Sequence, residues 1–114
     1  MVASQKYQNK QVAIYGMGIT GLSAAKTFKK LKADIHCWDD SKKIRNEVKK
    51  LKIPIRKFWL QTKSMDTIVI SPGIDINKCK IKKYLNKNLN KIITDLDLFF
   101  EKNKNSLMIS ITGT

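Results

Sequence analysis

The sequence has few cysteines, one histidine and no long apolar run. Cys37 and Cys79 stand alone, without the spacing typical of disulfide frameworks or zinc sites, and Cys37 is expected to be a buried small hydrophobe. No acid or hydroxyl lies at a triad-like spacing from His36, so we expect a packed imidazole and no catalytic residue. No run approaches the roughly 18 residues that cross a bilayer, and residues 1–10 lack the apolar segment of a secretory signal. These absences favour a cytoplasmic protein with no membrane partner and no metal site.

Acidic residues are also scarce, since 9 Asp and Glu face 23 Lys and Arg and give a formal net charge of +14. Only Arg45 and Arg56 are arginines, although readout of phosphates or bases would favour the planar arginine fork. The lysines are scattered among Asn and Ile, which resembles a coding bias. We therefore interpret the charge as a solvated surface and expect no nucleic-acid partner; a basic nucleic-acid-binding domain is the alternative.

Short apolar runs alternate with amphipathic segments along the chain. The runs predict strands at 11–15, 35–38, 67–70, 91–94 and 107–111, with a short edge strand at 53–55. Helical spacing of apolar residues predicts helices over 19–32, after a Ser41 cap through Leu51, around 81–85, and from Asp95. This alternation predicts an α/β fold, a single Rossmann-like domain whose open parallel sheet has helices on both faces.

The most informative stretch is Gly16-x-Gly18-x-x-Gly21, between the first strand and the first helix. Gly16 permits a sharp turn, Gly18 lets a ligand's phosphates approach bare backbone, and Gly21 lets the helix pack closely on the sheet. The N–H groups of Ile19 and Thr20 and the Thr20 hydroxyl lie at a helix start, which favours an anion. The stretch predicts a ligand bound through its diphosphate; a tight turn without a ligand is the alternative.

Polar residues follow two further strands at the same predicted edge of the sheet. Asp39 lies 18 residues after Gly21, a spacing typical of an acid that accepts a ribose hydroxyl. With Asp40 it would favour neutral hydroxyl or imide donors over a 2′-phosphate. The turn at 71–73, Ser-Pro-Gly, offers backbone N–H groups to a phosphate or sugar oxygen. The alternatives are helix capping by Asp39, a solvated Asp40 and a plain turn at 71–73.

Residues 106–114 suggest the start of another domain. An apolar strand leads into Thr112-Gly113-Thr114, as a strand leads into the turn of a P-loop, but the Gly-Lys-Ser/Thr that completes a P-loop is absent. We expect a ligand-binding domain over 1–105 and, over 106–114, the first strand of a truncated second domain.

Four segments together resemble the Mur ligases of peptidoglycan synthesis, and among them the amino-terminal domain of the MurD type. They are residues 16–25, 71–74, 94–99 and 109–114, in the order found in the family. The resemblance implies a Rossmann-like domain that binds UDP-N-acetylmuramoyl-L-alanine, in a cytoplasmic, ATP-dependent ligase that adds D-glutamate during cell-wall synthesis. ATP and magnesium would serve the full-length enzyme. This chain would hold neither, and it would bind the UDP-sugar as a monomer without catalysing.

The resemblance also implies roles for individual residues. The substrate would be contacted at its diphosphate, uridine and muramoyl parts by Gly18, Ile19, Thr20, Gly21, Asp39, Asp40, Ser41, Ser71, Pro72 and Gly73, and ATP by Thr112, Gly113 and Thr114. The family often has a hydroxyl residue and then Arg after the Asp39 position, so Lys42 or Lys43 is a candidate for the missing cation. An NAD-binding module of a dehydrogenase or regulatory protein, which shares the glycines and Asp39, is the alternative function.

Overall fold

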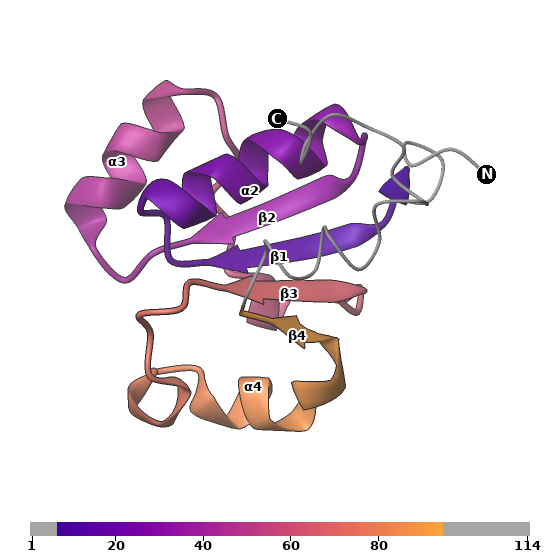
Figure 1. Ribbon diagram of the computed structural model, residues 1–114, viewed down its shortest axis with the longest axis vertical. Coiled ribbons are helices and arrows are strands. Elements are labelled where there is room, and N and C mark those ends of the chain that lie inside the picture. The colour runs from indigo at the N-terminus through magenta and orange to yellow at the C-terminus, as the bar shows by residue number, and fades with distance from the viewer. Residues whose placement is uncertain (1–6, 95–114) are drawn as a thin grey trace.

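A computed structural model describes residues 7–94, which form a parallel sheet covered by helices (Figure 1). The strands are β1 (Gln11–Tyr15), β2 (Asp34–Trp38), β3 (Thr67–Ile70) and β4 (Ile92–Ile93), in the order β2-β1-β3-β4. The helices are α2 (Ile19–Lys30), α3 (Lys42–Lys50) and α4 (Lys82–Lys87), with 3-10 turns η1 (Phe58–Leu60), η2 (Ile76–Lys78) and η3 (Leu89–Lys91). The predicted α/β fold with an open parallel sheet is confirmed.

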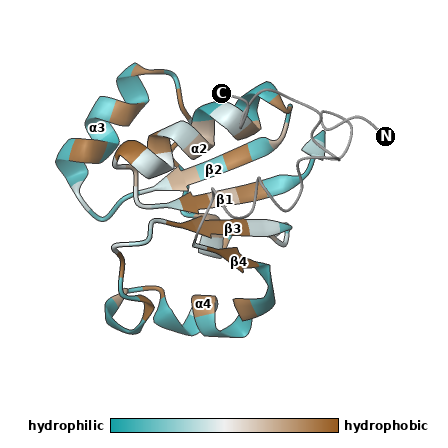
Figure 2. Ribbon diagram, in the orientation of Figure 1, coloured by the Kyte–Doolittle hydropathy of each residue, from teal (hydrophilic) through white to brown (hydrophobic). Residues whose placement is uncertain are grey.

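Side chains alternate along β1 and separate two apolar cores. Val12 and Ile14 pack in the core covered by α2 and α3, whereas Ala13 and Tyr15 pack in the core covered by η1 and α4. Figure 1 shows α2 and α3 on one side of the sheet and α4 on the other, and Figure 2 shows the apolar residues concentrated in the strands. Helices therefore cover both faces, as predicted, because each face of a parallel sheet is apolar.

The helix predicted after Ser41 is confirmed in its cap and shortened at its end. The Ser41 Oγ accepts a hydrogen bond from the Ile44 N–H at 3.3 Å, as an N-cap should. Leu51, predicted on the apolar face, lies just after α3 and is 51% exposed. The apolar contact of α3 with the core therefore comes from Ile44 and Val48.

The strand predicted at 53–55 is wrong, because only a single bridge forms there, between Ile55 and Cys37 of β2. The Cys37 N–H donates to the Pro54 carbonyl at 3.2 Å, and the Arg56 N–H donates to the Cys37 carbonyl at 2.9 Å. Proline has no N–H to extend this pairing. Cys37 itself is fully buried, as predicted, and burial raises its pKa to about 12.

Several predicted segments lie outside the described residues. These are the helix from Asp95, the strand at 107–111, the boundary between 105 and 106, and the P-loop start at Thr112, Gly113 and Thr114. Within residues 7–94, no helix is long and apolar enough to cross a membrane.

The strand order fixes where a ligand site is expected. The chain passes from β1 to β2 on one side, and then crosses to β3 on the other side of β1. The winding direction thus reverses between β1 and β3. Open α/β sheets bind ligands in the crevice outside the carboxyl ends of the strands at such a reversal. The glycine-rich turn follows β1, and the Ser-Pro-Gly turn follows β3, so both lie at this point.

Candidate functional site

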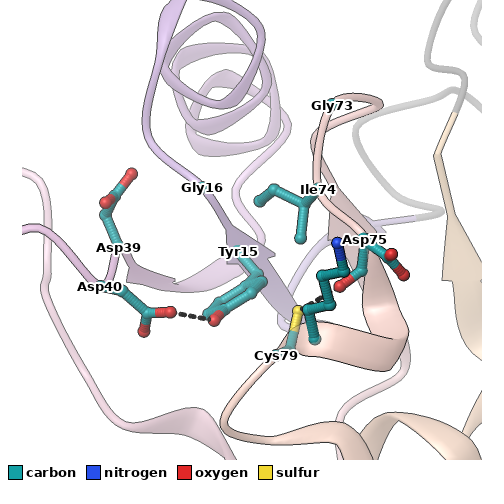
Figure 3. Close-up of a pocket in the computed structure, with 9 residues that line it drawn as sticks. Tyr15, Gly16, Asp39, Asp40, Gly73, Ile74, Asp75 and Cys79 are labelled. Carbon is teal, nitrogen blue, oxygen red and sulfur yellow. Dashed lines mark hydrogen bonds between the residues drawn. The ribbon is translucent and has the colours of Figure 1, made fainter.

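A pocket of about 530 Å³ opens at this reversal, and Figure 3 shows its walls. It is lined by Tyr15, Gly16, Asp39, Asp40, Gly73, Ile74, Asp75, Lys78 and Cys79. Among the residues predicted to bind ligand, Asp39, Asp40 and Gly73 line it. The sequence-based prediction missed Tyr15, Ile74, Asp75, Lys78 and Cys79. These residues could have been found only from their place in the fold, because Tyr15 ends β1 and the others follow the turn after β3.

Two glycines of the first turn are explained by the packing of the protein itself. Gly16 has φ +93°, and a Cβ there would lie 2.6 Å from the Cδ1 of Ile74. A Cβ on Gly21 would collide with the carbonyl oxygen of Gly16, so the start of α2 can approach the turn only with glycine there. Both observations agree with the roles predicted for these glycines.

Gly18 has no such explanation within the described residues. A Cβ on Gly18 would meet no atom within 4 Å, and its φ of −73° and ψ of −159° suit any L residue. The space that a side chain at position 18 would occupy is therefore empty of protein atoms from the described residues. A ligand approaching the backbone would account for a glycine at this position.

The start of α2 is open to an anion. Gly18 is its N-cap, no side chain bonds to the cap, and the first turn contains no acidic residue. Ile19 and Thr20 are both exposed, Ile19 by 92%. The first N–H groups of a helix lack intrahelical acceptors and lie at the positive end of its dipole, so they favour negative charge.

Asp39 connects the turn after β1 to the turn after β2. One carboxylate oxygen accepts from the Met17 N–H at 2.8 Å, and the other accepts from the Ser41 N–H at 2.8 Å. Asp39 thus has a structural role, but the residue that caps α3 is Ser41, so the alternative of helix capping by Asp39 does not describe that role. Each carboxylate oxygen can accept more than one hydrogen bond, so a ligand donor can still be accommodated.

Asp40 is fixed by two aromatic side chains. Its Oδ2 accepts from the Tyr15 hydroxyl at 2.6 Å, and its Oδ1 accepts from the Trp38 Nε1 at 3.3 Å (Figure 3 shows the first contact). Burial raises the pKa of Tyr15 well above its ordinary value, and the hydrogen bond to Asp40 raises it further. Tyr15 therefore remains a protonated donor at neutral pH, and Asp40 is held as an acceptor on the pocket wall.

The predicted residues at 41, 71 and 72 surround the pocket without lining it. Ser41 caps α3. The Ser71 Oγ donates to the Gly16 carbonyl at 3.1 Å, and the Ser71 N–H donates to the Tyr15 carbonyl at 3.2 Å. Ser71 therefore ties the turn after β3 to the turn after β1. Pro72 is exposed in the same turn, and Gly73 lines the pocket.

Arg45 lies beside the Asp39 turn, and Lys42 or Lys43 in the role of the missing family cation stays a prediction. The Arg45 Nη1 donates to the Asp39 carbonyl at 2.7 Å, and both lysines are exposed. Arg45 reaches this carbonyl because the first turn of α3 places its side chain over the loop from which the helix begins.

Charge is unevenly divided around the site. The pocket has the carboxylates of Asp39, Asp40 and Asp75 and one ammonium, that of Lys78. Acceptors of this kind suit neutral donors such as hydroxyl and imide groups, whereas the start of α2 suits an anion. In the part of the chain that the structure describes, no three His, Cys, Asp or Glu side chains could hold a metal ion.

Comparison with known proteins matches residues 10–93 to the family described as Mur ligase MurD-like, N-terminal domain. Proteins named UDP-N-acetylmuramoylalanine--D-glutamate ligase are similar to the chain. That of Wolbachia sp. subsp. Brugia malayi is 35% identical over 119 residues, covering 96% of this chain and 23% of the relative. That of Rickettsia prowazekii is 34% identical over 114 residues, covering 95% of this chain and 24% of the relative. That of Clostridioides difficile is 35% identical over 116 residues, covering 94% of this chain and 25% of the relative. The chain spans about a quarter of the length of these curated relatives.

Proposed function

Since the chain belongs to the family of MurD-like N-terminal domains of Mur ligases, we propose that it binds UDP-N-acetylmuramoyl-L-alanine. The parent enzyme would be an ATP-dependent ligase that joins D-glutamate to this substrate in peptidoglycan synthesis. The relatives' names, which give the acceptor and the amino acid joined to it, support this proposal.

The observation that carries the proposal is the division of charge at the strand reversal. The start of α2, with Gly18, Ile19 and Thr20, has no acidic side chain in its first turn, so a diphosphate fits there. The wall formed by Asp39 and Asp40 presents carboxylate oxygens, which would accept the ribose hydroxyls and the uracil imide N–H. A UDP-sugar carries an anionic diphosphate in the middle and neutral hydrogen-bond donors on its uridine. It would therefore match both the start of α2 and the wall formed by Asp39 and Asp40.

Residues of the second turn would complete the ligand's surroundings. Gly73 lines the pocket and a Cβ there would meet nothing within 4 Å, so its backbone is open to a sugar or phosphate oxygen. Ser71 would act by fixing the Gly16 turn. ATP and magnesium would be held by the full-length enzyme, with Thr112, Gly113 and Thr114 contributing the start of the ATP loop. This chain alone would bind substrate as a cytoplasmic monomer and catalyse no ligation.

Calorimetric titration of the chain with UDP-N-acetylmuramoyl-L-alanine, and separately with NADH, tests the proposal. Saturable binding of the UDP-sugar alone, weakened by Thr20→Ala or Asp39→Ala, is the expected result. Binding of NADH alone would overturn it in favour of a redox-type nucleotide module. A second assay supplies ATP, magnesium, D-glutamate and the UDP-sugar; release of phosphate by the chain would contradict the inactivity we propose.

A further inference from the structure

Arg45 and Arg56 are the two arginines of the chain, and both are half-buried with bonded guanidinium groups. The lysines of α3 are exposed instead: Lys42, Lys43, Lys49 and Lys50. Arg45 lies over the Trp38 ring, with its guanidinium carbon 4.4 Å from the ring centroid, and its Nη1 donates to the Asp39 carbonyl. The planar, weakly hydrated guanidinium can stack face to face on a ring while its edge donates hydrogen bonds, whereas an ammonium has no planar face to stack.

These contacts connect Arg45 to the pocket although it does not line it. Arg45 stacks on the Trp38 ring, which Trp59 also contacts edge-on with centroids 5.4 Å apart, and the Trp38 Nε1 donates to Asp40. Asp40 in turn accepts from Tyr15, which comes from the central strand. Arg45 also bonds the backbone of Asp39, whose carboxylate fixes the Met17 N–H in the turn that leads to α2. One side chain on α3 thus supports both carboxylates of the pocket wall.

We propose that Arg45 is a positioning residue that holds Asp39 and Asp40 in the orientation the ligand requires. The inference rests on the proposed function of the same pocket. Arg45 acts on Asp40 through Trp38 and on Asp39 through its carbonyl, so part of its contribution depends on the Asp40 carboxylate being present. Direct contact between Arg45 and the ligand would not create that dependence.

Arg45→Lys keeps the charge and removes the planar group, and calorimetry with UDP-N-acetylmuramoyl-L-alanine measures the effect. We expect the Kd to rise about five- to tenfold. Arg56→Lys is the matched control, because Arg56 pairs with Asp34 at the other end of β2, at 2.9 Å, and its Kd should stay within about twofold of the wild type. In an Asp40→Ala background, which removes both acceptor oxygens, Arg45→Lys should raise the Kd by a smaller factor than in the wild type, namely the part carried by the Asp39 carbonyl.

A ligand-free readout accompanies the titrations. The indole N–H resonance of Trp38, assigned with Trp38→Phe, should shift in Arg45→Lys and stay unchanged in Arg56→Lys. Trp38→Phe retains a ring under Arg45 but loses the donor to Asp40, so it should weaken binding by a similar factor. This variant tests the same connection if Arg45→Lys unfolds.

The outcomes separate the two proposals. If the wild-type chain binds no UDP-sugar, the proposed function fails and this inference fails with it. If the wild type binds and a folded Arg45→Lys binds equally well, the inference alone is overturned. Fully additive effects of Arg45→Lys and Asp40→Ala would also overturn it, since they would mean that Arg45 does not act through Asp40.

Discussion

Replacing Gly18 by serine should stabilise the fold and weaken ligand binding at the same time. The backbone of Gly18 suits an L residue, and a Cβ there meets no atom within 4 Å, so serine enters without strain. As the N-cap of α2, serine can accept a hydrogen bond from the N–H of Thr20 or Gly21, which no side chain caps now. Together with the smaller entropy of the unfolded chain, this should raise the free energy of unfolding by about 0.5–1.5 kcal/mol.

The same change places a side chain where the diphosphate would lie. The introduced hydroxyl would also occupy an N–H group that the phosphate needs. Loss of one hydrogen bond to a charged group costs about 1.5–3 kcal/mol, so the Kd for UDP-N-acetylmuramoyl-L-alanine should rise about 10- to 150-fold. Urea denaturation measures the stability and calorimetry measures the Kd. The control is Ser23→Ala, at an exposed position of α2 outside the predicted site, which should leave the Kd unchanged.

A folded Gly18→Ser variant that binds like the wild type would refute this reasoning. It would mean that the ligand does not approach the start of α2, and that the open space at Gly18 has another cause. A variant that loses stability would refute the other half, since it would show that glycine is required there by the fold.

Three further predictions concern stability. Gly21→Ala should lower the free energy of unfolding in urea by about 3 kcal/mol or more, because its Cβ would collide with the Gly16 carbonyl. Phe28→Ala should lower the same quantity by about 3–5 kcal/mol, because Phe28 is fully buried between α2 and the sheet; a loss below about 1 kcal/mol would contradict that packing. Burial lowers the pKa of His36, partly offset by Asp34, so the unfolded chain binds a proton more readily than the folded one. The contribution of His36 to stability should therefore be constant above about pH 6.5 and fall below it, and the difference in the free energy of unfolding in urea between pH 7.5 and pH 5.5 should be smaller in His36→Gln.

Local signals in the sequence were sufficient for most of the described elements. Strands β1 and β3 match the predicted 11–15 and 67–70, because a short continuous apolar run, as expected of a strand buried on both faces, is itself a local property. The Ser41 cap and the roles of Gly16 and Gly21 were also predicted, since each depends on backbone geometry within a few residues. The strand at 53–55 was wrong because its pairing depends on which N–H groups face β2, which local hydropathy does not report.

The sequence by itself determined the turns, the caps and the two faces of each strand, since these follow from neighbours along the chain. Only the tertiary structure decided which side chains meet at the pocket. Tyr15, Asp40 and Cys79 come from three separate segments, and they converge because β1 lies between β2 and β3. The contact of Arg45 with Trp38 likewise needed the folded structure, because stacking depends on where a side chain lies in space.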